Sequence, residues 1–570
     1  MITLNNINLS SIDLSGIDLR GIKLGLGGRG GGSGDGFPQL PGDVTRWHFG
    51  GLTNEMMAAM DDPRIEDADG KGRFLSFKNF LWAGMSGVGG YADNFSSESW
   101  KKPSDRSDIT WTSSSFNITR VMNTGVQMYY QAAWEESESV IPEKRIIVKG
   151  LEDGQVLRYM NVGNRIIEIS QDGIYTIPSF IFKGVSSYHG YSLAKKQESC
   201  DITIEQLPLY PGFILGDGVD DEAVTKNNLD LEDTYTVYTP LILLKYGGVV
   251  CGKSSAKDYS LNTVTSSKSI GFDSANSWSG SIPVDLYKFV LVVCKRNSKT
   301  MYVKDLITGK SNQSNSKEFV SNPGKYFIWR NTGGSWSQVA IAGQVICNGH
   351  FTTDEEDEKV LNWHKKQYPW LFPDQAWTVT GKTNEDTDRA TIANITGNGN
   401  NLVLSNLGFI EGSGYNEEGE YAGYLVTDGV DDKIVSSAFT MGKDFTAVGE
   451  WAIIDEIDSR SGISKDFSLK ILGKQNGLWL FINDPGNSIV IETKSLKAVC
   501  SDGRVYLNDW IEVVSSAKQR TPGSNNSMDI GFVYNDFAQM VFKNLAIYPT
   551  VLSKEDCIKA YNYLQTLKAK

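Results

Sequence analysis

The pentapeptide Asp217-Gly218-Val219-Asp220-Asp221 returns later in the chain as Asp428-Gly429-Val430-Asp431-Asp432. Apolar residues lie just before each copy, and residues that alternate in polarity follow it. The copies lie 211 residues apart (428 − 217). A repeated pentapeptide with similar flanks predicts that one structural unit occurs twice in the chain, and it aligns the two units.

A second internal match lies upstream of each pentapeptide and has a different spacing. Residues 65–79 align without gaps on residues 392–406, an offset of 327 that holds through Ser86-Gly87 and Ser413-Gly414. The first unit therefore contains 116 additional residues between the two matches (327 − 211). This is the size of a small domain.

The additional block spans about residues 94–207, and its later half contains short β-rich runs. The runs are Arg145–Val148, Val156–Tyr159, Arg165–Ile169 and Ile174–Ile177. Such runs, separated by Gly- or Asn-containing turns, predict an antiparallel sheet. We interpret the block as an inserted immunoglobulin-like β-sandwich, and a less regular, elaborated loop is the alternative.

Both units are predicted to be β-sandwiches that each end in one helix. Many short β-rich runs with Gly, Asn and Asp between them follow each pentapeptide, which indicates two packed sheets. The segments 353–356 and 553–556, 200 residues apart (553 − 353), each place a hydroxyl three residues before an acid. This pattern is typical of a helix N-terminus. We expect the first unit to end at Pro373 and the second to begin near Trp377.

The first 24 residues repeat an Ile- or Leu-containing pattern every five residues. Ile2, Ile7, Ile12, Ile17 and Ile22 each precede a leucine by two positions. The pattern resembles a short pentapeptide-repeat coil, which is too short to bury a core alone. We expect it to dock or oligomerise against a neighbour, and a flexible tail is the alternative. Residues 25–42 are rich in Gly and Pro and predict a flexible linker that cannot pack.

Composition and charge exclude several classes of protein. A hydrophobic share of 40% over 570 residues predicts several packed domains. The formal net charge of −13 argues against a nucleic-acid partner. The N-terminus lacks the pattern of a secretory signal, and the chain has no run of about 18 apolar residues. We therefore expect neither export by the usual route nor membrane insertion.

The six cysteines are scattered along the chain with no close pair and no metal-type spacing. This distribution is typical of buried thiols in a protein made in a reducing cytoplasm. A single disulfide between distant positions is the alternative.

The segments Leu215–Asp221, Val426–Asp432 and Val551–Asp556 resemble motifs of the laminin-G-like, concanavalin-type jelly-roll family. The lead-in at residues 383–402 further resembles fibre proteins of crAss-like phages of gut Bacteroidota. The resemblance implies an all-β fold of tandem jelly rolls, the first carrying the inserted sandwich. The predicted units are an anchor (1–24), a linker (25–42), the first jelly roll (43–93 and 208–373), the inserted sandwich (94–207) and the second jelly roll (374–570).

The resemblance implies a virion appendage, a head or tail fibre that displays carbohydrate-binding-type modules to its host. Its partners would be capsid or tail proteins through the N-terminal segment, a host surface glycan, and further copies of the chain in a homo-oligomer. It would be synthesised in the host cytoplasm and located on the virion surface. Duplicated modules fit this role, because weak glycan sites gain from multivalency. A capsule-degrading glycan depolymerase and a bacterial surface adhesin are the alternatives.

The two pentapeptides favour turn structure over a metal site. Asp-Gly supplies a tight turn, and the aspartates that follow can accept hydrogen bonds from nearby amides. Calcium is the alternative, because it takes several carboxylate and carbonyl oxygens. Its weak candidates are Asp217, Asp221, Asp428 and Asp432. We expect no other cofactor.

Glycan binding needs an exposed aromatic face for the C–H groups of a sugar, with amides or carboxylates for its hydroxyls. Trp278 and Trp336 lie in segments of small residues, where their rings would tend to be exposed. They are the predicted ligand-binding residues, and packing against their own loops is the alternative. Trp451, Trp479 and Trp510 lie in apolar runs and are expected in the core.

The sequence does not indicate catalytic residues. His48, His189, His350 and His364 lie apart from any His-Glu or Cys-His pattern. The carboxylate pairs of glycosidases cannot be recognised from spacing, because they meet only in the fold. We therefore expect no enzymatic activity.

Overall fold

The computed structural model describes most of the chain from residue 36 to residue 569. The positions within this range that it does not describe are 96, 98–99, 102–106, 122–125, 132–137, 142, 153, 162–163, 179, 184–187, 194–199, 254–258, 275–276, 320–322, 331–335, 418–420, 455–460, 466–468, 475–476, 483–487, 492–494, 509, 515–525 and 534–535. The predicted anchor, residues 1–24, lies outside the described residues.

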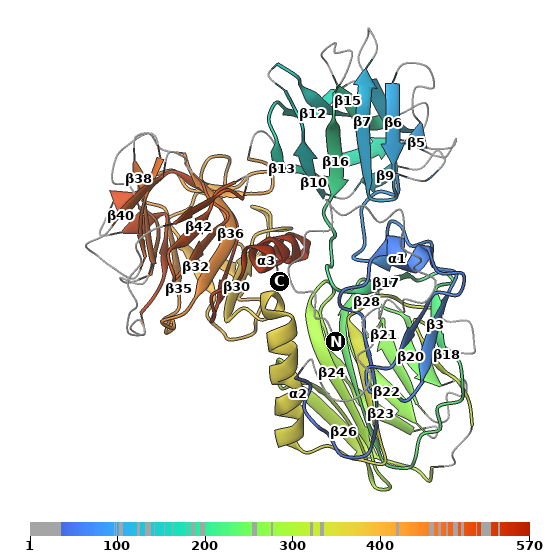
Figure 1. Cartoon of the computed structure of the whole chain (residues 1–570). Helices are drawn as coiled ribbons and strands as arrows, with labels where there is room; N and C mark the ends of the chain where they lie inside the picture. Colours follow the sequence, from blue (N-terminus) through green and yellow to red (C-terminus); the bar gives the residue numbers. More distant parts are fainter. Residues whose placement is uncertain are drawn as a thin grey trace, which may run out of the picture.

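Two antiparallel sheets form the first jelly roll (Figure 1). The first sheet contains, in order, β26 (Ser311–Asn315), β25 (Thr300–Asp305), β24 (Phe289–Arg296), β19 (Tyr235–Leu243), β28 (Gln338–Ile341), β17 (Ile214–Asp217) and β4 (Gly87–Val88). In addition, β29 (Gly343–Asn348) pairs with β19, and β1 (Asp43–His48) pairs with β29. The second contains β2 (Arg64–Glu66), β3 (Phe74–Lys78), β18 (Glu222–Thr225), β27 (Tyr326–Ile328), β20 (Gly248–Lys253), β21 (Ser260–Val264), β22 (Ser269–Ser274) and β23 (Ser277–Pro283). Buried aromatic residues such as Trp47, Phe77 and Trp329 fill the space between the sheets.

The second jelly roll repeats this arrangement. One sheet contains β33 (Gly414–Tyr415), β34 (Leu425–Val426), β47 (Met540–Tyr548), β36 (Thr446–Ile453), β41 (Ala498–Cys500), β42 (Arg504–Tyr506) and β43 (Glu512–Val514), with β30 (Gln375–Thr378) also on β47. The other contains β31 (Thr391–Ile392), β32 (Leu402–Ser405), β35 (Lys433–Ser436), β44 (Asp529–Ile530), β37 (Ser461–Lys465), β38 (Leu469–Lys474), β39 (Gly477–Ile482) and β40 (Ser488–Ile491). A short pair, β45 (Phe532–Val533) and β46 (Asp536–Phe537), lies beside them.

The additional block is a β-sandwich with its own core. One sheet contains β13 (Gly173–Ile177), β10 (Lys144–Lys149), β16 (Ile202–Gln206), β7 (Ser115–Val121) and β6 (Ser107–Trp111). The other contains β12 (Asn164–Ile169), β11 (Leu157–Asn161), β15 (Tyr188–Leu193), β8 (Val126–Gln131) and β5 (Trp100–Lys101), and β9 (Glu138–Ile141) pairs with β14 (Phe180–Lys183). Phe95, Phe116, Tyr159 and Tyr191 are buried between the sheets. The predicted fold class, tandem jelly rolls with a sandwich inserted in the first, is confirmed.

Each jelly roll ends in the predicted capped helix. In α2 (Asp354–Gln367), Thr353 accepts from the amide of Glu356 and the Glu356 side chain accepts from the amide of Thr353, a complete capping box. In α3 (Lys554–Thr566), Ser553 accepts from the amide of Asp556 at 3.1 Å. The described residues also form the helix α1 (Asn54–Ala58) and the 3-10 turn η2 (Pro369–Leu371). No helix among the described residues is long and apolar enough to span a membrane.

The end of the predicted linker is packed, contrary to the expectation that residues 25–42 cannot pack. Phe37 and Leu40 are buried in one apolar cluster with Val360 and Trp363 of α2. The rings of Phe37 and Trp363 meet edge to face with centroids 5.1 Å apart. The two apolar residues are buried because they pack against the apolar face of α2.

A shared apolar cluster joins the two jelly rolls. It contains Phe213 and Phe289 from the first, Trp370 from the connecting segment, and Tyr548 and Tyr563 from the second. Tyr548 donates a hydrogen bond to the carbonyl of Trp370 at 3.0 Å. Figure 1 shows α3 at the centre of the molecule, between the second jelly roll and the rest of the chain. A large apolar junction of this kind fixes neighbouring domains relative to each other.

All six cysteines are buried and carry free thiols, as the sequence predicts. The predicted core tryptophans Trp451 and Trp510 are 3% and 2% exposed. The side chain of Trp479 lies outside the described residues.

Candidate functional site

The first Asp-Gly-Val-Asp-Asp pentapeptide forms a tight turn whose carboxylates accept hydrogen bonds from their own neighbours. Asp217 Oδ1 accepts from the amide of Val219 at 2.7 Å. Asp221 accepts from the amide of Asp217 at 2.8 Å through Oδ2 and from the hydroxyl of Ser86 at 3.0 Å through Oδ1. Gly218 has a φ of 78°, in the left-handed region that favours glycine.

The second pentapeptide makes the same contacts. Asp428 Oδ1 accepts from the amide of Val430 at 2.8 Å, and Asp432 Oδ2 accepts from the amide of Asp428 at 2.8 Å. The hydroxyl of Ser413 donates to Asp432 at 2.9 Å. Ser413 is the counterpart of Ser86 at the offset of 327, so the structure brings the two internal sequence matches together in both jelly rolls.

Each turn gathers three carboxylates that could hold a cation. Asp217, Asp220 and Asp221 form one group, and a second group contains Asp428, Asp431 and Asp432, with oxygens that lie within 4.8 Å of one another. Burial raises the pKa of Asp221 to about 7, although the Asp217 amide opposes this, and burial also raises the pKa of Asp432. The hydrogen bonds within each turn support the turn interpretation, and calcium binding stays the untested alternative.

Trp278 lies on the outer face of the first jelly roll and is the one exposed Phe, Tyr or Trp side chain among those that the structure describes. Its side chain is 39% exposed. It pairs across β22 and β23 with Asp273, and its ring lies over Gly271, where a Cβ would meet Trp278 Cζ2 at 2.7 Å. The missing side chain at Gly271 therefore leaves room for the ring to lie against the sheet.

Polar residues lie on the strands next to Trp278. Asp273 pairs with Ser260, and Asn262 pairs with Gly271, on the neighbouring strand β21. Asp273 Oδ1 is buried without a hydrogen-bond partner among the described residues, and burial raises the pKa of this carboxyl while Lys317 lowers it. We call Asn262, Gly271, Asp273 and Trp278 the Trp278 face.

A strand of polar residues lies next to the Trp278 face. The five residues of β26 are Ser-Asn-Gln-Ser-Asn, and the hydroxyl of Ser314 donates to the carbonyl of Trp278 at 2.7 Å. Asn312 donates to the carbonyl of Ser281 at 3.1 Å. These contacts connect the edges of the two sheets and place amide side chains near an exposed ring.

Trp336 is half-buried, and the structure does not bring it to the Trp278 face. The guanidinium of Arg330 lies 5.6 Å from the centroid of its ring. Arg330 also pairs with Glu222. The indole nitrogen of Trp336 is buried without a hydrogen-bond partner among the described residues. Trp336 thus offers a smaller aromatic surface to a ligand than Trp278 does.

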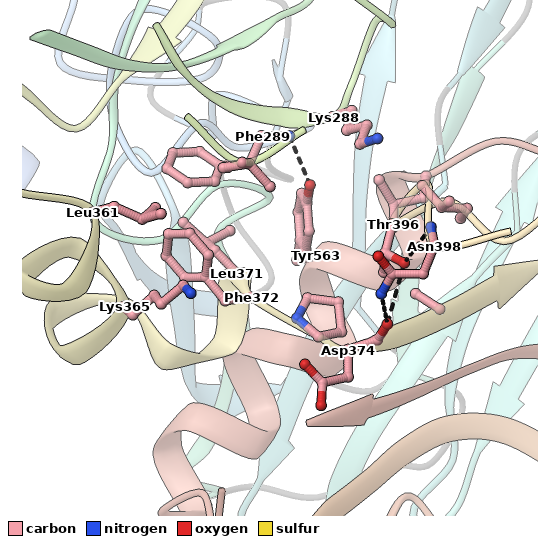
Figure 2. A pocket seen from close by; sticks show the side chains of 15 residues that line it. Lys288, Phe289, Leu361, Lys365, Leu371, Phe372, Asp374, Thr396, Asn398 and Tyr563 are labelled. Carbon is pink, nitrogen blue, oxygen red and sulfur yellow. Dashed lines mark hydrogen bonds between the residues drawn. The ribbon is translucent and has the colours of Figure 1, made fainter. Parts of the chain in front are cut away.

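A pocket of about 220 Å³ lies at the junction of the two jelly rolls, and no sequence motif indicated it (Figure 2). Residues that line it include Lys288, Phe289, Leu361, Lys365, Phe372, Asp374, Thr396, Asn398 and Tyr563. They come from both jelly rolls, from α2 and from the segment that connects the rolls. A second cavity of about 600 Å³ shares Lys365, Phe372 and Asp374 with this junction pocket.

The histidines have structural contacts, not a shared site. His189 bonds to Tyr159 at 2.6 Å, and burial lowers its pKa to about 3. His364 bonds to the carbonyl of Val360, and burial lowers its pKa to about 4. His350 lies 2.9 Å from Glu356, within the capping box of α2. His48 bonds to the hydroxyl of Tyr368 at 2.9 Å, so each of the four histidines has a structural partner in the part of the chain that the structure describes.

No protein-family profile and no curated protein sequence matches this chain. Several solved structures are similar to parts of this chain. A heptameric SAP-like pentraxin from Limulus polyphemus is 16% identical, with 22% of this chain and 68% of the pentraxin covered and a TM-score of 0.17. The carbohydrate-binding module CBM66 from Bacillus subtilis is 14% identical, with 22% and 79% covered and a TM-score of 0.16.

A further similar structure is the Trypanosoma rangeli sialidase in complex with the inhibitor DANA. It is 8% identical, with 81% of this chain and 93% of the sialidase covered and a TM-score of 0.23. Similarity at this level does not assign a function, so the function argued below depends on the residues of this chain.

Proposed function

We propose that this protein is a non-enzymatic, glycan-binding component of a virion appendage, with the Trp278 face as its sugar site. The observation that carries the binding proposal is the exposed ring of Trp278 beside Asp273 and Asn262. The ring supplies an apolar plane for the C–H groups of a sugar, and the carboxylate and amide supply partners for its hydroxyls. Sugar binding by the Trp278 ring, the Asp273 carboxylate and the Asn262 amide does not require a catalytic step.

The appendage role rests on the modular layout and on the resemblance of the motifs to phage fibre proteins. Two jelly rolls and an inserted sandwich are suited to display at a distance from a capsid or tail. We propose that the repeat of residues 1–24 docks on capsid or tail proteins, that the chain forms homo-oligomers, and that it is located on the virion surface. Several copies would strengthen a weak glycan contact through multivalency.

The binding proposal is tested by titrating the full chain with polysaccharides from the surface of candidate host bacteria. The exposed 39% of the Trp278 side chain is about 100 Å², given the ~250 Å² of a whole tryptophan. Covering about half of this area at about 25 cal/mol per Å² stabilises a complex by roughly 1.3 kcal/mol, which is about tenfold in Kd. Trp278→Ala should therefore bind about tenfold more weakly. Ile511→Ala, which removes an exposed apolar side chain of the second jelly roll, should bind like the wild type.

Unchanged affinity in Trp278→Ala would remove the Trp278 face as the site. An assay of reducing ends released from the same polysaccharides separates binding from depolymerisation. We expect no release, and release would favour the depolymerase alternative. Immunogold labelling of virions tests the appendage role, and label confined to bacterial envelopes would favour a surface adhesin.

A further inference from the structure

We propose that the junction pocket binds a carboxylate-bearing sugar of one-ring size, because it combines aromatic walls with lysine side chains at its edges. The site is separate from the Trp278 face, and the proposal does not depend on glycan binding there. It assigns a second ligand class to the molecule at the place where the two jelly rolls meet.

The size of the pocket suits one small ring. Its volume of about 220 Å³ is roughly seven times the ~30 Å³ that a water occupies in the liquid, and it is below the range of drug-sized sites. Phe289 and Phe372 form one side, with ring centroids 5.4 Å apart in an edge-to-face arrangement. Aromatic walls favour a ligand that presents C–H groups on a rigid ring.

The charge of the pocket favours an anion. Lys288 and Lys365 lie on either side of the pocket in Figure 2, and Asp374 is the one carboxylate among the residues that line it. The lining therefore carries a net positive charge in a chain whose formal net charge is −13. Lys365 comes from α2 in the first jelly roll, and Asp374 begins the second.

Hydrogen-bonding groups complete the pocket. Thr396 and Asn398 donate to the carbonyl of Asp374 at 3.2 and 2.6 Å, which fixes the turn that carries them and leaves the Asn398 side-chain oxygen as an acceptor at the rim. Tyr563 accepts from the amide of Phe289 at 2.7 Å, so its own proton can be donated to a ligand (Figure 2). These groups match the hydroxyls of a sugar, whereas an inorganic anion would leave the aromatic walls unused.

Calorimetric titration of the full chain tests the proposal, with sodium D-glucuronate as the probe and D-glucose and sodium acetate as comparisons. Glucuronate should bind at least about tenfold more tightly than either, since glucose lacks the carboxylate and acetate lacks the ring. Raising NaCl from about 50 mM to about 500 mM should weaken glucuronate binding, because salt screens the lysines. Absence of binding by glucuronate, or equal binding by glucose or acetate, would overturn the proposal.

The matched variants are Lys365→Met and Lys366→Met, adjacent positions on α2. Lys365 lines the junction pocket, whereas Lys366 lines only the second cavity. We expect Lys365→Met to bind glucuronate at least about tenfold more weakly and Lys366→Met to bind it like the wild type. Equal affinity of the two variants would exclude Lys365 as the carboxylate partner and overturn the assignment. Trp278→Ala should bind glucuronate normally, which separates this site from the proposed glycan face.

Discussion

Replacing Glu450 with glutamine should destabilise the second jelly roll next to its contact with the inserted sandwich. Glu450, on β36, has a side chain that is only 13% exposed and accepts a hydrogen bond from Tyr424 at 2.7 Å. Lys543 lies 3.7 Å from Glu450 and donates to Glu143 of the inserted sandwich at 3.1 Å. Lys497 lies 3.8 Å from Glu450. Glu450→Gln keeps the shape of the side chain but removes the charge that both lysines face.

The magnitude follows from the pKa of Glu450. Burial alone would raise it, but Lys497, Lys543 and the hydroxyl of Tyr424 lower it to about 2, from an ordinary value of 4.5. At 1.36 kcal/mol per pH unit, this difference corresponds to about 3 kcal/mol of stability at pH 7. Burial lowers the pKa of Lys497, whereas Glu450 and Glu143 together raise the pKa of Lys543 against the effect of burial.

The sign of the pH dependence is fixed by the direction of this shift. A carboxyl with a depressed pKa in the folded state stabilises the fold above its unfolded pKa and loses this effect as the pH falls toward the folded value. The contribution of Glu450 should therefore be complete at pH 7 and decline to about 2 kcal/mol by pH 3.5. Glu450→Gln should lose stability at pH 7 and approach the wild type in acid.

Differential scanning calorimetry at pH 7 and pH 3.5 measures this effect. A loss of about 3 kcal/mol should lower the Tm of the second jelly roll by roughly 6–12 °C at pH 7. Glu385→Gln, an exposed carboxylate in the same jelly roll, is the control and should leave the Tm unchanged. A variant Tm within about 1 °C of the wild type at pH 7, or a difference that does not shrink in acid, would refute this reasoning.

Two further predictions concern the first pentapeptide and Gly216, the residue before it. Gly216→Ala would place a Cβ 2.4 Å from Cδ1 of the buried Trp329, so it should destabilise the first jelly roll by about 1–3 kcal/mol. Gly442→Ala is the control, because its nearest contact would be 3.4 Å, and it should leave the stability unchanged. Urea unfolding measures both, and equal midpoints would contradict the clash. The pKa of Asp221 is raised to about 7, so the folded state binds this proton more tightly than the unfolded state, and the resulting stability is lost as the pH rises toward 7. Asp221→Asn should flatten the pH dependence of the urea midpoint between pH 4 and 7, and an unchanged slope would count against this origin.

Local sequence chemistry predicted the repeated parts of the fold. The side chain of Asn79 donates to the carbonyl of Asp220 at 2.9 Å, and that of Asn406 donates to the carbonyl of Asp431 at 3.0 Å. These pairs combine the two offsets seen in the sequence. The turns and helix caps of both units are predictable from the sequence, because they depend on residues whose types are specific to those conformations.

The junction pocket and the Glu450 contacts were not predictable in the same way. Lys365, Phe372 and Tyr563 are common residue types in ordinary contexts, and they meet only because the two jelly rolls pack on each other. The Gly and Pro residues around Phe37 and Leu40 predict a flexible linker. The apolar face of α2 that buries them is more than 300 residues away in the chain. Of the two predicted tryptophans, only the structure distinguishes the exposed Trp278 from the half-buried Trp336.

The position of the inserted sandwich explains how the first jelly roll accommodates so large an addition. In the second jelly roll, residues 416–424 connect β33 to β34, and the amide of Asn416 bonds to the carbonyl of Tyr424 at 2.9 Å. The equivalent strands β4 and β17 pair in the same way, and the sandwich replaces this connection. The amide of Gly89 bonds to the carbonyl of Phe213 at 2.8 Å and the amide of Leu209 to that of Gly90 at 2.9 Å, so the two ends of the sandwich lie side by side.

Because the chain leaves and re-enters the sheet at neighbouring residues, the insertion adds a domain at little cost in loop closure. The sandwich then contacts the second jelly roll through Glu143 and Arg145, whose guanidinium donates to the carbonyl of Asn562 at 3.1 Å. Contact at both its base and its side holds the sandwich against both jelly rolls. We expect this arrangement to present the Trp278 face and the junction pocket in a fixed relation, which a flexible tandem of domains would not provide.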